Sequence, residues 1–118
     1  MYAVNGTSIK LTRGDTFYTT VGIKNKMDGT EYTPDPNDAL RFVLKRNLMS
    51  ADKRSFRDIK PLIEKNIPID TMRLKLEPED TKPLAFGNYV YDIELTKANG
   101  DVDTIINQAP FSLLPEVD

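Results

Sequence analysis

Apolar and polar residues alternate along most of this chain of 118 residues, and a period of two is typical of a β-strand with one buried face. The alternation is strictest between residues 87 and 96, which predict the central strand of the fold. Residues 102 to 106 predict a second strand. The residues expected on one face of the central strand are Tyr89, Tyr91, Ile93 and Leu95, and those on the other are Val90, Asp92, Glu94 and Thr96.

The connection between these two strands contains the dipeptide Asn99-Gly100. Both residue types tolerate positive φ, as the two central residues of a type I′ turn require. A loop of these two residues places Ala98 opposite Asp101. It also places Ile93 opposite Ile106, so that apolar positions meet across the hairpin. We therefore predict a tight hairpin with a two-residue loop.

Shorter alternating runs predict further strands on either side of this hairpin, separated by turns and proline-containing loops. Two of them, Leu62–Ile67 and Thr71–Glu77, are close enough in sequence to pair as a hairpin. Pro78–Leu84 predicts one helical or 3₁₀ turn, with Leu84 and Phe86 closing the end of the core. The other predicted strands are Ser8–Thr12, Thr16–Lys24, a short edge strand at Thr30–Thr33, Ala39–Arg46 and Ala109–Leu114.

Seven to nine short strands with turn signals every 8 to 12 residues are typical of an all-β sandwich or a small barrel, and we favour the sandwich. The length of 118 residues predicts one domain, 1–118, with residues 1–7 as a flexible lead-in. The N-terminus has neither the charged nor the apolar region of a signal peptide. No apolar run reaches the roughly 20 residues that span a bilayer, so no membrane association is expected.

The composition predicts a protein without enzymatic chemistry. A net charge of -2 gives no basic surface for nucleic acid. The chain contains no His, Cys or Trp, so the commonest general base, thiolate metal ligands and disulfides are all absent. No lysine lies in an apolar sequence context that would activate a Ser or Thr nucleophile. We expect no catalytic, cofactor-binding or metal-binding residues.

The acidic residues come closest to a candidate functional site in this sequence. Asp92 and Glu94 share the polar face of the central strand, where a carboxylate pair can perform acid–base chemistry or bind a hard cation. The favoured interpretation is that both are solvated residues of a polar strand face. Asp101 and Asp103, beside the predicted turn, are candidate Ca²⁺ ligands, but they lack the spacing of an EF-hand loop, and a turn is the favoured interpretation.

Three other groups are candidates for contacts. Arg13-Gly14-Asp15 spells the integrin-binding tripeptide, but these residue types also favour a turn, which we prefer. The loop Asn47–Lys60 carries a basic stretch from Lys53 to Lys60 around Phe56. It is interpreted as an exposed connection, with contact to phosphates or an acidic partner as the alternative. Four of the five tyrosines are assigned mainly to the core or sheet edges: Tyr18, Tyr32, Tyr89 and Tyr91.

Several of these stretches carry a resemblance to a known group of proteins. They are Ile9–Thr16 with its Arg-Gly-Asp-Thr run, Asp38 before the strand Leu40–Leu44, Glu77–Thr81, Gly87–Leu95 and Gly100–Ile105. Together they resemble small proteins encoded by phages and prophages of Gram-positive bacteria. They are also similar to the N-terminal domain of phage baseplate upper proteins, in which an RGDT-like start precedes an Ig-like β-sandwich. The chain differs from the baseplate proteins in stopping after one domain, which argues against direct host binding.

The resemblance implies an Ig-like antiparallel β-sandwich and a tail- or baseplate-associated virion protein, made in the bacterial cytoplasm. It transfers no catalytic residues. The leading hypothesis is therefore a non-enzymatic structural or adaptor protein that contacts other phage proteins, copies of itself, or both. The alternative is a carbohydrate- or Ca²⁺-binding β-sandwich module that uses Asp92, Glu94, Asp101 and Asp103.

Overall fold

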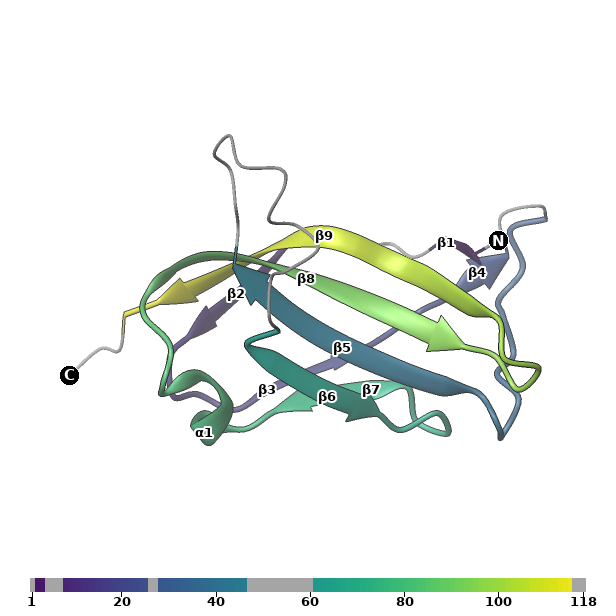
Figure 1. Ribbon diagram of the computed structural model, residues 1–118, viewed down its shortest axis with the longest axis horizontal. Helices are drawn as coiled ribbons and strands as arrows, with labels where there is room; N and C mark the ends of the chain where they lie inside the picture. Colours follow the sequence, from purple (N-terminus) through teal and green to yellow (C-terminus); the bar gives the residue numbers. More distant parts are fainter. Residues whose placement is uncertain (1, 4–7, 26–27, 47–60, 116–118) are drawn as a thin grey trace.

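The computed structural model describes residues 2–3, 8–25, 28–46 and 61–115, and these residues form a mainly β structure with one helical turn (Figure 1). The predicted basic loop between residues 47 and 60 lies outside the described residues. So do residues 4–7 of the predicted lead-in. The elements are β1 (Tyr2–Ala3), β2 (Ile9–Thr12), β3 (Phe17–Thr20), β4 (Lys24–Asn25), β5 (Ala39–Arg46), β6 (Ile63–Ile67), β7 (Arg73–Leu76), α1 (Pro78–Thr81), β8 (Gly87–Thr96) and β9 (Val102–Leu114).

A curled five-stranded sheet, in the order β2-β9-β8-β5-β6, forms the larger layer (Figure 1). The pairs β3–β7 and β1–β4 form two small separate sheets. The expectation of a wholly antiparallel arrangement is wrong, because β2 runs parallel to β9, with Ile9 opposite Phe111. The physical reason is connectivity. The chain leaves β2 for β3 in another sheet, and no hairpin then forces β2 to run antiparallel to its neighbour.

The core lies between the five-stranded sheet and β3–β7, and both layers contribute apolar side chains to it. Phe42 of β5 packs against Tyr91 of β8, with 5.5 Å between ring centroids, and both contact the ring of Phe111 of β9. The residues that the alternation assigns to the buried faces of β5 and β8 therefore lie in the core, but Val43 and Asp92 on the opposite face are buried as well. The largest fully buried side chains are Phe42, Phe111, Leu40, Leu44, Leu74, Leu76, Ile93, Leu95, Leu113 and Thr81.

The predicted hairpin between Leu62–Ile67 and Thr71–Glu77 is wrong. β6 pairs with β5, and β7 pairs with β3 in the other layer, so the chain crosses from one layer to the other at this point (Figure 1). At the crossing, Met72 has a φ of +53°, and its N–H donates to the Pro68 carbonyl over 2.7 Å. Because β6 and β7 lie in different layers, the apolar residues of both strands face the same core from opposite sides.

The β8–β9 hairpin has a three-residue loop instead of the predicted two. The Gly100 N–H donates to the Lys97 carbonyl over 2.8 Å, the Lys97 N–H donates to the Asp101 carbonyl over 2.7 Å, and Gly100 has a φ of +97°. A turn followed by a residue of positive φ is the usual three-residue hairpin loop. Ile93 nevertheless faces Ile106 as predicted, because a bulge in β9 restores the register.

The predicted strand from Thr16 to Lys24 keeps its alternation but is divided. β3 pairs with β7 and β4 pairs with β1, while Val21 and Ile23 between them are buried and Gly22 is exposed. β1 also gives Tyr2–Ala3 of the predicted lead-in a paired strand. The division leaves residues 21 to 23 extended between two small sheets, which matters for the pocket described below.

The helical turn α1 forms as predicted, closed by a capping box in which the Glu77 N–H donates to Asp80 Oδ2 over 2.7 Å. The expectation that Leu84 and Phe86 both close the core holds for Leu84, which is partly buried and packs on the core. It is wrong for Phe86, whose exposure is 48%. Among the described residues, no helix is long and apolar enough to cross a membrane.

Candidate functional site

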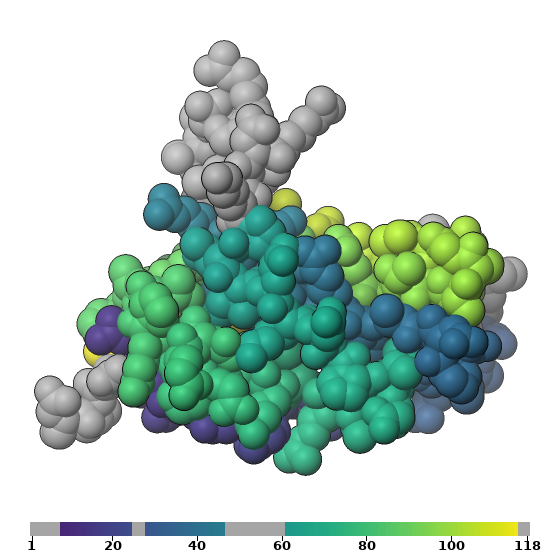
Figure 2. Space-filling view, turned by 60° about the horizontal axis from the view of Figure 1, so that its bottom comes forward, coloured from purple at the N-terminus to yellow at the C-terminus, as the bar shows by residue number. Residues whose placement is uncertain are grey.

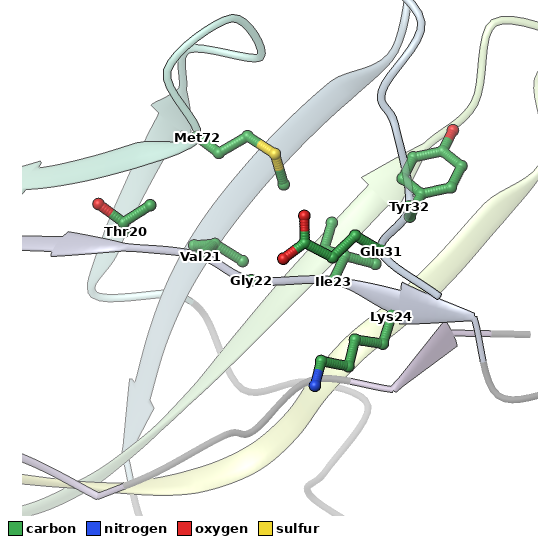
Figure 3. Close-up of a pocket in the computed structure, with 8 residues that line it drawn as sticks. All are labelled: Thr20, Val21, Gly22, Ile23, Lys24, Glu31, Tyr32 and Met72. Atoms are coloured by element: carbon green, nitrogen blue, oxygen red, sulfur yellow. The ribbon is translucent and has the colours of Figure 1, made fainter. Parts of the chain in front are cut away.

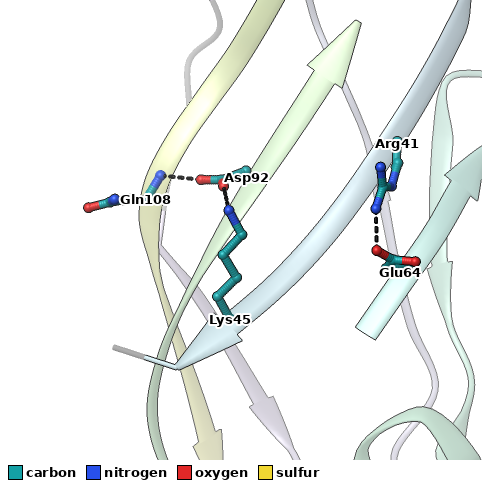
Figure 4. A network of polar contacts seen from close by, with 5 residues as sticks. All are labelled: Arg41, Lys45, Glu64, Asp92 and Gln108. Carbon is teal, nitrogen blue, oxygen red and sulfur yellow. Dashed lines mark hydrogen bonds and ion pairs between the residues drawn. The ribbon is translucent and has the colours of Figure 1, made fainter. Parts of the chain in front are cut away.

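Asp92 is a structural residue of the outer sheet face. Its side chain is only 8% exposed, and its Oδ2 lies 2.8 Å from Lys45 Nζ (Figure 4). Its Oδ1 accepts the backbone N–H of Gln108 over 2.7 Å. Gln108 has a φ of +52° and lies at a second bulge of β9, opposite the step from Tyr91 to Ile93. The interpretation of Asp92 as a solvated residue is therefore wrong, because this carboxylate fastens the bulge.

The other three acidic candidates do not join Asp92 in a site. Glu94 faces Thr104, whereas Asp103 faces Leu95 on the opposite face of the hairpin. The Asp101 carboxylate receives a hydrogen bond from the Asn99 side chain, 3.3 Å away. Within the part of the chain that the structure describes, no group of three or more His, Cys, Asp or Glu side chains is arranged to hold a metal ion.

The Arg13-Gly14-Asp15 stretch forms the predicted turn, with Gly14 at a φ of +86°. The Gly14 N–H donates to Oγ1 of Thr81, which is fully buried, over 2.9 Å. The Arg13 guanidinium donates to the Leu84 carbonyl over 3.3 Å and lies 4.5 Å from the ring centroid of Phe86. The turn is therefore packed on the end of α1 and on the segment after it, and its arginine contacts the protein's own surface.

Four of the five tyrosines, Tyr18, Tyr32, Tyr89 and Tyr91, divide between core and surface. Tyr89 and Tyr91 are buried, as the alternation predicts. Tyr32 is partly buried, and its hydroxyl donates to Oδ2 of the buried Asp38. Tyr18 of β3 is 47% exposed.

Tyr18 lies in a cluster of cations on the outer side of the β3–β7 sheet. The Arg73 guanidinium is 4.3 Å from its ring centroid, and Lys75 Nζ is 5.3 Å away. Hydrogen bonding to Glu77, and secondarily to Tyr18, raises the pKa of Lys75. Figure 2 shows residues of β6, β7 and α1, in teal and green, side by side on one face of the molecule.

A pocket of about 410 Å³ lies where β3 gives way to β4 (Figure 3). Its floor is the extended stretch Thr20–Lys24. Met72 forms one wall at the start of β7, and Tyr32 and Glu31 form the opposite wall. In Figure 3 the Glu31 carboxylate points into the space between Met72 and Tyr32, and the Lys24 ammonium points away from it.

The backbone hydrogen bonds along one edge of the floor stretch Thr20–Lys24 are interrupted. The Val21 N–H donates to the Met72 carbonyl over 2.8 Å, and the Ile23 carbonyl accepts the Tyr32 N–H over 2.9 Å. Both bonds lie on the same edge of the extended stretch, because residues two apart present their backbone groups to the same side. Between them, the Val21 carbonyl and the Ile23 N–H face the gap, and neither has a hydrogen-bond partner among the described residues.

Sequence analysis missed this pocket. The sequence predicts a short edge strand over Glu31 and Tyr32, whereas in the structure Glu31 forms an isolated bridge with Lys24. Met72 lies within the predicted strand Thr71–Glu77, and the alternation gives it no role in a site. No local pattern points to the pocket, because its walls lie about forty residues apart in the chain and meet only through the crossing between layers.

In the sequence Asp38 is simply the residue before a predicted strand, but in the structure its carboxylate joins three separate segments by hydrogen bonds. Besides Tyr32, its carboxylate accepts the N–H groups of Asp35 and Ala98, over 3.0 and 2.9 Å. Burial works to raise the pKa of Asp38, but the hydrogen bonds from Tyr32, Asp35 and Ala98 and the charge of Lys97 outweigh it, so that the pKa is lowered. Asp38 thereby fixes one wall of the pocket.

Comparison with known proteins adds no family to this geometry. The chain matches no protein-family model, and no curated protein matches it significantly. A function for this chain is therefore inferred from the described residues and from the resemblance of its sequence motifs.

Proposed function

We propose that this chain is a non-enzymatic structural or adaptor protein of a phage or prophage particle, associated with the tail or baseplate. Its β fold, proposed to be an Ig-like sandwich, serves as a scaffold for protein–protein contacts. The partners are other proteins of the particle, copies of itself, or both. The resemblance of the Arg-Gly-Asp-Thr run and of the Gly87–Leu95 strand to phage proteins supports the setting.

The observation that carries the contact role is a pair of exposed aromatic rings, each stacked with an arginine. Tyr18 is 47% exposed beside Arg73, and Phe86 is 48% exposed beside Arg13. Tyrosine and arginine are enriched at the energetic centres of protein interfaces. A guanidinium that is already stacked on a ring loses less conformational freedom when a partner covers it.

The two pairs belong to different parts of the fold. Tyr18 lies on β3, whereas Phe86 lies between α1 and β8. Each pair supplies a candidate contact for a partner protein. Exposed rings also cost little stability when they are replaced, so each surface is open to mutational test.

The test is the composition of particles purified on a density gradient from the bacterial host that carries the gene. Quantitative mass spectrometry should find the wild-type chain in the particle fraction in a fixed ratio to other tail proteins. Tyr18→Ser and Phe86→Ser should each reduce that ratio at least fivefold. Val102→Ser, which replaces another exposed apolar residue, 59% exposed, is the matched control. A wild-type chain that stays out of the particles contradicts the proposal.

A further inference from the structure

The pocket beside Thr20–Lys24 has an acidic group without a counterion. The Glu31 side chain forms no hydrogen bond or ion pair with any described residue. Its carboxylate points into the pocket, and the nearest cation of the lining, Lys24, points elsewhere (Figure 3). Glu31 is an exposed residue at the rim of the pocket, and a carboxylate aimed into a concave space attracts a cationic ligand group.

The floor of the pocket adds a donor and an acceptor. The Ile23 N–H and the Val21 carbonyl face the gap without partners among the described residues. This pair matches the carbonyl and N–H of a peptide backbone, which is how extended peptides bind at open sheet edges. Between the two groups lies Gly22, where an added Cβ would meet no atom within 4 Å. A ligand side chain therefore has room to lie across this glycine.

The walls are held in place before any ligand arrives. Tyr32 is fixed through its hydroxyl, which donates to the buried Asp38. Met72 is held at a φ of +53°, which is unfavourable for a residue with a side chain, by hydrogen bonds at its N–H and its carbonyl. Strained backbone of this kind clusters at ligand sites. A thioether and an aromatic ring suit the aliphatic stem of a lysine or arginine.

We propose that this pocket binds a basic residue in an extended segment of a partner polypeptide. The lysine or arginine head group pairs with Glu31, and its stem lies across Gly22 between Met72 and Tyr32. The backbone of the segment bonds to the Ile23 N–H and the Val21 carbonyl. The inference deepens the proposed assembly role by naming the chemistry of one partner segment, and it depends on that role only for its biological setting.

The test is an NMR titration of the ¹⁵N-labelled full chain with the peptide acetyl-Thr-Val-Lys-Val-Thr-amide. We expect saturable shifts of the Gly22, Ile23 and Met72 amides. Replacing the peptide's lysine by norleucine should weaken binding at least fivefold. So should Glu31→Gln, which removes the charge and keeps the shape, whereas Glu79→Gln, at an exposed carboxylate of α1, should leave affinity unchanged.

Gly22→Val should abolish the shifts, because its side chain enters the open space above the floor while the extended backbone accepts a β-branched residue. The spectrum of the free variant shows whether the fold is intact. The proposal is overturned if the lysine and norleucine peptides bind equally, if Glu31→Gln has no effect, or if butylamine alone binds as tightly as the peptide. The titration uses the isolated protein, so its failure is distinct from absence of the chain from particles.

Discussion

Replacing Asp38 by alanine should destabilise the fold by about 3 kcal/mol, because three donors lose their acceptor at once. These donors are the Tyr32 hydroxyl and the N–H groups of Asp35 and Ala98. A buried donor left without a partner costs about 1–3 kcal/mol. Asp35 and Ala98 belong to exposed residues, so water compensates in part and about 1 kcal/mol for each donor is the appropriate value.

Urea unfolding followed by far-UV circular dichroism measures this loss, and the melting temperature should fall by roughly 12 °C for a domain of this size. Asp38→Asn retains one acceptor oxygen and should lose about half as much. Glu31→Gln, at a carboxylate without a hydrogen bond to any described residue, is the control and should change stability by less than about 0.5 kcal/mol.

The pH dependence supplies an independent check. Despite burial, the hydrogen bonds to Asp38 and the charge of Lys97 lower its pKa in the folded state. Its ionised form is therefore favoured by folding, and this contribution is complete above the unfolded pKa of about 3.9. It disappears as the pH falls through the folded pKa. The stability difference between wild type and Asp38→Asn should be constant above about pH 5 and should narrow below about pH 4.

Two results would refute this reasoning. One is a loss of less than about 1 kcal/mol in Asp38→Ala, which would mean that water replaces all three hydrogen bonds. The other is a difference between wild type and Asp38→Asn that stays constant down to the lowest pH at which both fold. That result would mean that the Asp38 carboxylate has the same pKa in the folded and unfolded chains.

The hairpin and its bulge give two further predictions. Asp92→Ala should lower the free energy of unfolding, measured with urea, by about 2–3 kcal/mol, because it leaves the partly exposed Lys45 and the Gln108 N–H unpaired. Glu94→Ala is the control. An equal loss in Glu94→Ala would contradict the structural role of Asp92. Asn99→Gly should destabilise by about 0.5–1 kcal/mol, because the Asn99 side chain accepts the Asp101 N–H over 2.9 Å; a gain in stability would instead favour a type I′ turn.

Sequence alone was sufficient for several features that neighbouring residues decide, although it gave the β8–β9 loop two residues instead of three. Strands β5, Ala39–Arg46, and β8, Gly87–Thr96, have the bounds that alternation predicts. A strand with a period of two has a buried face in almost any sheet, so the core residues follow from the pattern. The turn at Gly14 follows similarly, because few residues tolerate positive φ.

The pairing of strands was beyond local patterns. Alternation assigns each residue to a face but does not identify the neighbouring strand, which is why the parallel β2–β9 pair and the crossing from β6 to β7 were not predicted. The same limit applies to Asp92. Its position on the polar face is correct, yet its burial depends on a bulge contributed by β9, sixteen residues away.

The pocket is the clearest case of a feature that only tertiary structure decides. Glu31, Met72 and the stretch Thr20–Lys24 carry no shared motif, and each belongs to a different connection in the chain. They meet because the start of β7 and the bridge at Glu31 both lie along the same edge of one extended segment. The sequence by itself determined which residues are apolar and where the chain turns. The non-local pairing of strands decided where the backbone was left open to a partner.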